Sequence, residues 1–391
     1  MRIDTKIAER LKKVNPSSTL AITAKAKKLK SEGKDVVGLA AGEPDFDTPD
    51  FIKDAAIEAI KSGFTKYTPT TGIPELKKAI CEKFKKDNSI EYSSEQIVVS
   101  CGAKHCIFNS LMVLINRGDE VLIPSPYWVS YPEMVQICDG VPRFIRTTAQ
   151  NNFKISSKDL EKHISPKTKV LLLNSPSNPT GCVYNKEELE EIAKICVKKK
   201  VFIISDEIYE KLIYDGEKHI SIASLNNEIY PLTITVNGLS KSYSMTGWRI
   251  GYLGASKEIA EAISRLQDHS TSNPVSISQK AALTALNTPA GFFENINNEF
   301  NKRRDYCLSR INSMKNISCV IPRGAFYIFC DISKTGLDSS VFADRLLEEV
   351  SVSLIPGAGF GANKYIRISF ATEMEQLEKG MDRLSEWLNK I

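Results

Sequence analysis

KVLLLNSPSNPTGCVYNKEELEEIAKICVKKKVFIISDEIYE, residues 169–210, contains the pattern that decides the fold. An apolar run, VLLL, ends in a loop rich in Pro and Asn, and a segment with helical periodicity follows over 186–199. A second apolar run, VFII, then ends at Asp206. Unbroken apolar runs that alternate with helices are typical of parallel strands buried on both faces. The stretch therefore predicts a strand–helix–strand unit of a parallel sheet.

Other segments repeat this alternation. Five further apolar runs predict strands at 96–100, 120–126, 142–147, 233–238 and 249–255. From about residue 291 the pattern changes to helices at 292–314 and 338–349, strands at 327–333 and 365–371, and a last helix with Leu377, Met381, Leu384 and Leu388 at helical spacing. We therefore expect an α/β fold with a mostly parallel central sheet and helices on both faces. This large domain would span 46–290, and a smaller α+β domain would combine 1–45 with 291–391.

The composition excludes several classes of protein. Of 391 residues, 42% are hydrophobic and 25% are charged, and the net charge of +5 gives no sign of a nucleic-acid partner. No apolar run approaches the ~18 residues of a membrane helix. The N-terminal sequence MRIDTKIAERLKK lacks the apolar core of a secretory signal. Nine cysteines without a C-x-x-C motif predict a reduced, cytoplasmic protein, and four scattered histidines predict no metal site.

The chemically informative residues follow the strands, at the edge where open parallel sheets bind ligands. Asp206 ends the run VFII, and Tyr209 comes one turn later. An acid there could bind Mg²⁺ in a nucleotide hydrolase, but the chain has no G-x-x-x-x-G-K-[ST] loop. Asp206 could instead pair with a protonated ring nitrogen, or it could simply cap a helix.

Two loops at the same edge offer polar groups. NSPSNPTG, residues 174–181, is a rigid loop that presents Asn174 and Asn178, and an amide of Asn178 can donate to a phenolate-like oxygen. In SCGAKHC a strand gives way to a helix at Gly102 and Ala103, and free N–H groups at a helix start bind phosphate. A plain strand-to-helix turn also explains that second segment.

Lys241 lies in a third loop, NGLSKSYSMTGWRIGY, between two apolar runs. Burial would lower its pKa and favour Schiff-base chemistry, although most single lysines are solvated surface charges. Ser240 and Arg249 in the same loop suit a phosphate. The bulky apolar neighbours of Lys241 favour a buried amine.

Arg367 and Trp128 complete the set. Arg367 alternates with Ile366 and Ile368 in a strand, so its guanidinium suits a substrate carboxylate unless it faces solvent. Trp128 follows a strand and suits a planar ring unless it belongs to the core. Together these groups match one cofactor, a planar pyridine with an aldehyde, a phenolic oxygen, a ring nitrogen and a phosphate.

The sequence resembles the class I aminotransferases of the pyridoxal-phosphate family (fold type I), the bacterial aspartate aminotransferases among them. The resemblance runs from about residue 15 to the C-terminus. It rests on GEPDFDTP (42–49), KYTPTTGIPELK (66–77), SPYWVSYPEM (125–134), NSPSNPTG (174–181), SDEIYE (205–210) and SKSYSMTGWRIGY (240–252). It implies pyridoxal 5'-phosphate as cofactor, amino acid and keto acid substrates, and a homodimer with shared active sites.

The resemblance implies a role for each motif residue. Lys241 matches the lysine that binds the cofactor covalently and then acts as general base and acid. Asp206 matches the acid beside the ring nitrogen, Tyr209 and Asn178 the donors to the phenolic oxygen, and Trp128 the stacked ring. The groups expected around the phosphate are Gly102, Ala103, Lys104, Ser240, Arg249 and, from the other subunit, Tyr67. Those expected around the substrate are Arg367, Gly42, Trp128 and Asn178.

Two positions depart from the family pattern. Gly238 stands where some relatives carry a serine, so Ser240 is expected to supply the hydroxyl. No arginine occurs between Arg265 and Arg303, where other aspartate enzymes carry one for the distal carboxylate. Recognition of that carboxylate is therefore expected from Lys104 and from Ser17, Ser18 or Thr19.

The resemblance implies transamination from L-aspartate to 2-oxoglutarate, giving oxaloacetate and L-glutamate. Aromatic, alanine, kynurenine or prephenate specificity remains an alternative, as does β-elimination from cysteine conjugates. Asn15 and Arg323 are the positions where we would look for a prephenate site. A transcription regulator on the same fold would need an added DNA-binding segment, and the enzyme domains already use nearly every residue.

Overall fold

The computed structural model describes residues 8–16, 18–289 and 291–391. Its largest sheet has seven strands within these ranges, in the order β2-β8-β7-β6-β5-β3-β4. They are β2 (Ile97–Ser100), β3 (Glu120–Ser125), β4 (Val141–Arg146), β5 (Thr168–Asn174), β6 (Phe202–Asp206), β7 (Thr233–Gly238) and β8 (Gly251–Gly254). Of these strands β8 runs antiparallel to its neighbours and the other pairs are parallel. The expected α/β fold with a mostly parallel sheet is confirmed.

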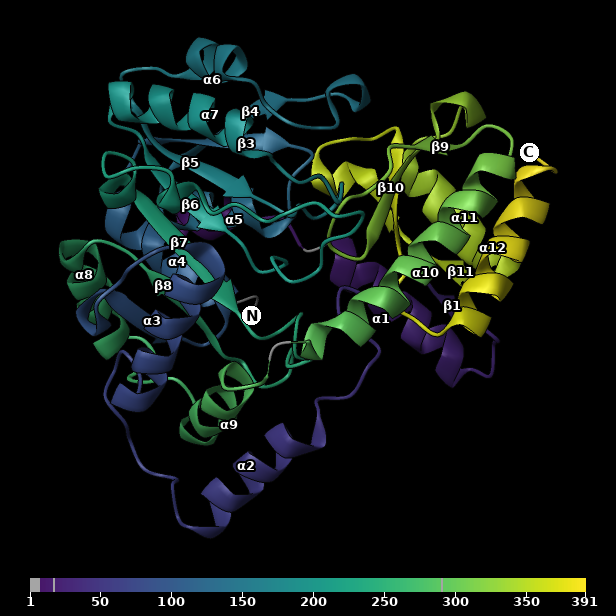
Figure 1. Ribbon diagram of the computed structural model, residues 1–391. Coiled ribbons are helices and arrows are strands. Elements are labelled where there is room, and N and C mark those ends of the chain that lie inside the picture. The colour runs from purple at the N-terminus through teal and green to yellow at the C-terminus, as the bar shows by residue number, and fades with distance from the viewer. Residues whose placement is uncertain (1–7, 17, 290) are drawn as a thin grey trace, which may run out of the picture.

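Helices cover both faces of this sheet (Figure 1). One face carries α4 (Ala103–Leu114), α5 (Ser130–Ile137) and α8 (Lys257–Asp268). The other carries α3 (Pro74–Asn88), α6 (Ser157–His163), α7 (Lys186–Lys199) and α9 (Ser276–Leu286). Leu172 of β5 packs toward the first group, and Leu171 and Leu173 pack toward the second. Because successive side chains point to opposite faces, strands buried on both sides must be apolar throughout.

A second group of elements lies beside the large sheet (Figure 1). Its sheet has the order β12-β13-β10-β9, with β9 (Ser318–Cys319), β10 (Tyr327–Asp331), β12 (Ile355–Pro356) and β13 (Tyr365–Ser369). Its helices are α10 (Phe292–Ser313), α11 (Ser339–Val350) and α12 (Met374–Leu388). Phe326, Phe342 and Trp387 are among the buried side chains of its core.

The N-terminal segment joins this second group. Strand β1 (Val37–Gly38) pairs in parallel with β11 (Val352–Ser353), and Asp35 forms ion pairs with two basic residues of α12. Helix α2 (Asp50–Lys61) packs instead on α9. The domain limits at residues 45 and 290 stay a prediction, which these contacts support. No helix in the described ranges has the length and apolar character needed to cross a membrane.

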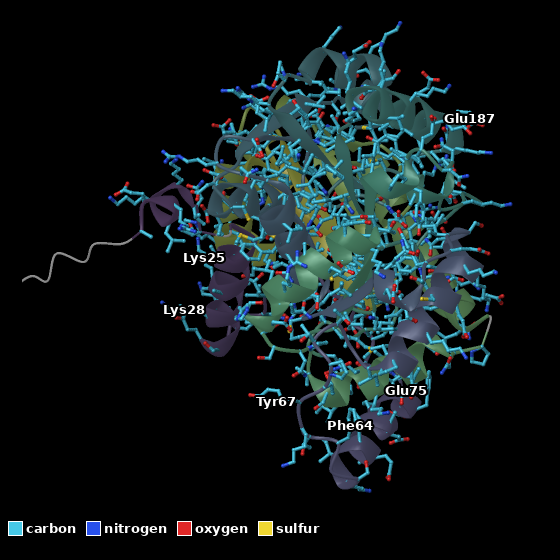
Figure 2. The ribbon with its side chains drawn as sticks, turned by 90° about the vertical axis from the view of Figure 1, so that its left-hand side faces the viewer. Lys25, Lys28, Phe64, Tyr67, Glu75 and Glu187 are labelled. Carbon is cyan, nitrogen blue, oxygen red and sulfur yellow. The ribbon has the colours of Figure 1, made fainter. Side chains whose placement is uncertain are left out.

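Helix α1 (Ser18–Ser31) is anchored to the second group by ion pairs. Nζ of Lys25 lies 2.9 Å from a carboxylate oxygen of Asp344 and 2.9 Å from one of Glu348, both on α11. The helix also contacts β11 and β12. Figure 2 shows Lys25 and Lys28 on α1, at the edge of the molecule.

One strand begins later than the sequence predicts. The apolar pattern predicts a strand from residue 249, but β8 begins at Gly251. Arg249 has a φ of 51°, which does not fit a strand. Its guanidinium donates to the carbonyl oxygens of Thr246 (2.8 Å) and Cys101 (3.2 Å). The backbone therefore turns at Arg249 before the sheet begins.

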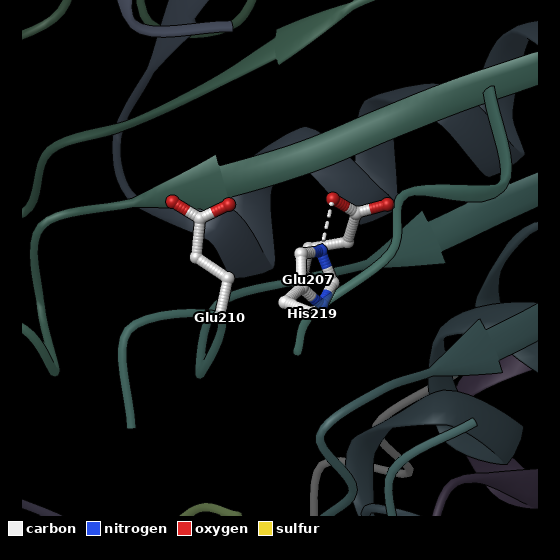
Figure 3. Close-up of side chains that lie close together, drawn as sticks. All are labelled: Glu207, Glu210 and His219. Carbon is white, nitrogen blue, oxygen red and sulfur yellow. Dashed lines mark hydrogen bonds and ion pairs between the residues drawn. The ribbon is translucent and has the colours of Figure 1, made fainter. Parts of the chain in front are cut away.

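A buried polar cluster follows the end of β6 (Figure 3). Nε2 of His219 lies 2.8 Å from Oε2 of Glu207, and Glu210 lies close to both side chains. These three groups are close enough to share a metal ion, but their oxygens already have protein partners. Asn88 of α3 donates to Glu207 (3.3 Å) and Glu210 (2.8 Å), and Lys83 forms an ion pair with Glu210. The cluster ties α3 to the segment that follows β6.

We expect Lys83→Met to lower the free energy of unfolding by about 3–5 kcal/mol, because the buried Glu210 carboxylate would lose its cation. Urea denaturation followed by circular dichroism measures this change. Lys85→Met is the matched control on the same helix, since it removes a pair with Glu91 that is exposed to solvent. Equal losses in the two variants would contradict the role given to the cluster.

Candidate active site

A cavity of about 700 Å³ lies between the carboxyl edge of the large sheet and the second group of elements. It gathers residues from strands, loops and helices that are far apart in sequence. The sequence-predicted residues that line it are Gly42, Ala103, Lys104, Trp128, Asn178, Asp206, Tyr209, Ser240, Lys241, Arg249 and Arg367. The structure therefore brings together most of the residues that the sequence singled out.

Asp206 is a buried acid at the floor of this cavity. Its side chain ends β6, and only 4% of the residue is exposed. Burial raises the pKa of Asp206 to about 6, although Tyr131 donates a hydrogen bond of 2.7 Å to Oδ2 and the amide of Ile208 donates to Oδ1. No salt bridge to Asp206 is present among the described residues. Its carboxylate is therefore suited to form an ion pair with a cationic group bound in the cavity.

Lys241 presents an amine to the same cavity. Burial lowers its pKa to about 8, with Arg367 and Arg249 acting in the same direction against Glu43 and Asp206. Nζ donates a hydrogen bond of 2.5 Å to the carbonyl oxygen of Gly42. An amine with this pKa is partly neutral near pH 8 and can act as a nucleophile or a base.

Arg367 is a buried guanidinium on β13, with 3% of the residue exposed. Its Nη1 donates to Oδ1 of Asn178 (2.9 Å) and its Nη2 to the carbonyl oxygen of Ala40 (3.0 Å). The guanidinium carbon lies 4.1 Å from the centre of the Tyr327 ring. Its Nε is buried without a hydrogen-bond partner, so this fork retains capacity for a carboxylate. The solvent-facing alternative for Arg367 is excluded.

The start of α4 forms a compact corner of the site. The first turn of a helix leaves N–H groups without intrahelical acceptors, here at Ala103 and Lys104. Gly102 caps the helix with a φ of 94°, and a Cβ there would lie 2.7 Å from Nη2 of Arg249. The positive φ favours glycine at this position. Free amides, Arg249 and the buried Ser240 surround a space suited to an anion.

Trp128 and Lys104 form one wall of the cavity. Nζ of Lys104 lies 4.9 Å from the centre of the Trp128 ring, and the edge of Tyr131 packs against the same ring at 5.3 Å. Burial lowers the pKa of Lys104, and the charge of Arg249 lowers it further. Tyr209, the fifth residue of the SDEIYE motif, also lines the cavity, and its hydroxyl shares a 2.9 Å hydrogen bond with the hydroxyl of Tyr327.

Some expected residues lie elsewhere. Tyr67 is 89% exposed and does not line the cavity, as Figure 2 shows for its position at the surface. Asn15 donates to Glu133, and Arg323 forms an ion pair with Asp215; neither lines the cavity. Ser17 and the side chains of Ser18 and Thr19 lie outside the described residues.

Among the cavity residues that the sequence did not single out are Tyr131, Tyr327 and Glu43. Tyr131 follows Trp128 by three positions within SPYWVSYPEM, so helical spacing could have indicated it. Tyr327 belongs to β10, which pairs with the strand of Arg367. No local pattern distinguishes it from a core tyrosine.

Residues 34–384 match the family model of aminotransferase class I and II. The aspartate aminotransferase of a Bacillus species is 49% identical over 387 residues, which cover 98% of this chain and 99% of that protein. A probable aspartate/prephenate aminotransferase of Rickettsia conorii is 48% identical, over 98% of this chain and 99% of that protein. The solved aspartate aminotransferase from Thermus thermophilus with maleate gives a TM-score of 0.94 at 40% identity and covers 98% of this chain and 99% of that one. The resemblance seen in the motifs is thus confirmed over nearly the whole chain, and this protein belongs to the aminotransferases of class I and II.

Proposed function

We propose that this aminotransferase moves the amino group of L-aspartate to 2-oxoglutarate, giving oxaloacetate and L-glutamate. The observation that carries the proposal is a pair of cations in one cavity, the buried Arg367 and Lys104, whose Nζ lies over the Trp128 ring. A substrate with two carboxylates can use both, whereas alanine can use only one. Relatives named aspartate aminotransferase, one of them solved with the dicarboxylate maleate, support this choice.

Prephenate is a second candidate substrate, because a relative carries the name aspartate/prephenate aminotransferase. Prephenate also has two carboxylates, so the same two cations suit it. Asn15 and Arg323 give it no support, since neither lines the cavity.

The site fits pyridoxal 5'-phosphate as cofactor. The buried Asp206 carboxylate suits a protonated ring nitrogen, the amine of Lys241 suits an aldehyde, and the corner at Gly102 suits a phosphate. Tyr209 and Asn178 offer donors for the phenolic oxygen. When bound, this cofactor supplies an electron sink for the charge that develops at the substrate Cα.

The side chains of this protein then bind, orient and transfer protons. Arg367 holds the α-carboxylate as a fork, and Trp128 limits tilting of the planar ring. Lys241, once its amine is free, would remove the proton from the substrate Cα and deliver it to the carbon that was the aldehyde of the cofactor. The carboxylate of Asp206 keeps a positive charge on the ring nitrogen through the reaction.

A homodimer with shared sites is part of the proposal. Tyr67 has an almost fully exposed side chain and lies outside the cavity of its own chain. A tyrosine so placed is available to a phosphate in a second copy. The cytoplasmic location stays a prediction, supported by the nine free cysteines among the described residues.

A panel of amino donors tests the proposal. With pyridoxal phosphate and 2-oxoglutarate supplied, kcat/KM for aspartate should exceed that for alanine, phenylalanine or kynurenine by about tenfold or more, since a charge-assisted hydrogen bond contributes about 1.5–3 kcal/mol. Lys241→Ala should lose the visible absorbance and nearly all turnover. Preference for another donor, or release of pyruvate from a cysteine conjugate, would refute the assignment.

Arg367→Lys should raise KM for every amino donor by about tenfold, because a point charge replaces a planar fork. Initial rates with aspartate and alanine measure the effect. Arg323→Lys, an arginine outside the cavity, is the control and should leave KM unchanged. A loss confined to aspartate would mean that Arg367 binds the distal carboxylate.

Tyr131→Phe should raise the pKa of Asp206 above about 6, because the hydrogen bond from Tyr131 stabilises the charged carboxylate. The charged form pairs with the ring nitrogen, so cofactor affinity should fall at a higher pH than in the parent protein. Titration of the apoprotein with pyridoxal phosphate between pH 5 and 8 measures this shift. Tyr127→Phe, whose ring stacks on Phe144, should leave the profile in place.

A further inference from the structure

We propose that Lys27 and Lys30 of α1 form a cationic rim where the cavity meets solvent, and that this rim speeds the capture of dicarboxylate substrates. The inference rests on the proposed function and adds a device for selecting substrates by net charge. It concerns the encounter with substrate rather than the chemistry at Lys241.

The rim is one face of a helix. Thr23, Ala26, Lys27 and Lys30 all line the cavity, and their spacing of i, i+3, i+4 and i+7 places them on a single stripe of α1. Lys27 and Lys30 are exposed residues that nevertheless line the cavity. Their charges therefore lie at its opening.

The other lysines of this helix have different surroundings. Lys25 is held by Asp344 and Glu348, and Lys28 lies 3.9 Å from Glu32. Neither lines the cavity. Among the described residues, Lys27 and Lys30 form no salt bridge, so no carboxylate within these ranges pairs with them.

The cavity as a whole carries an excess of positive charge. Its cationic lining residues are Lys27, Lys30, Lys104, Lys241, Arg249 and Arg367, against the two acids Glu43 and Asp206. The proposed function uses Lys241, Arg249 and Asp206 for the cofactor. Arg367 and Lys104 are assigned to the substrate. Lys27 and Lys30 remain as cations without a bound partner.

Exposed charges act on a substrate mainly before it binds. Electrostatic attraction to a cleft lined by one sign of charge raises association rates by tenfold or more at low ionic strength. The effect is screened over about 10 Å at 0.1 M salt. Aspartate carries a net charge of about −1 at pH 7, whereas alanine is neutral, so the rim should favour aspartate.

The double variant Lys27→Gln/Lys30→Gln tests the rim in the enzyme loaded with pyridoxal phosphate. The half-reaction with the amino donor alone is followed by absorbance in a stopped-flow instrument. At about 0.02 M salt we expect the second-order rate constant for aspartate to fall about fivefold and that for alanine by less than about twofold. At about 0.5 M salt the difference should disappear, because the charges are screened. The limiting rate at saturation should not change.

Lys28→Gln is the matched control, since Lys28 lies on the same helix (Figure 2) but does not line the cavity. A loss of the same size in this control would overturn the proposal. An equal loss for alanine, or a loss that persists at high salt, would do so as well.

Binding of maleate, measured by calorimetry, gives a readout without turnover. The double variant should bind maleate about fivefold more weakly than the parent at low salt and equally at high salt. If the parent protein does not use aspartate, the proposed function fails while the maleate measurement still tests the rim. If the parent uses aspartate and the double variant behaves like Lys28→Gln, the rim alone is refuted.

Discussion

A carboxylate buried at the end of a parallel strand, without a cation of its own, is the constraint on which the site depends. Asp206 is held in place by one tyrosine and one amide, and burial raises its pKa to about 6. A buried charge is costly unless a partner compensates it. The arrangement is therefore suited to a bound ring that brings a positive charge. Lys241, whose pKa is lowered by burial in the same cavity, supplies the group that reacts with such a ring.

The second constraint is that two of the groups proposed to bind the substrate come from outside the large sheet. Arg367 lies on β13 and Gly42 follows β1, so both belong to the group of elements beside that sheet. The hydrogen bond between Arg367 and Asn178 joins this group to the loop after β5. The cofactor groups and the carboxylate fork are thus placed on opposite sides of one cavity. A change in the distance between the large sheet and the second group of elements would therefore move the carboxylate fork relative to the cofactor groups.

Charge is distributed within the cavity according to depth. Arg367 is buried and can contact a bound substrate directly, whereas Lys27 and Lys30 are exposed and, in the proposal, act before the substrate binds. A buried charge that pairs with the substrate fixes its orientation and affinity. Exposed charges instead govern the rate at which the substrate encounters the site and how that rate depends on salt. No arginine occurs between Arg265 and Arg303, so the proposed function assigns the distal carboxylate to Lys104.

The sequence by itself determined most elements of the large sheet and indicated the candidate reactive groups. Helix α7 spans the predicted residues 186–199 and β7 the predicted 233–238, because apolar periodicity is a local property. Asp206 and Lys241 stand in motifs that specify them without tertiary information. The tertiary structure decided the contacts that tune these groups. Tyr131 reaches Asp206 across 75 positions, Tyr327 reaches Tyr209 across 118, and Arg367 reaches Asn178 across 189. The orientation of the Lys27 and Lys30 stripe toward the cavity was likewise set by packing of α1 on β11 and β12, because a helix periodicity shows which residues share a face but not what that face meets.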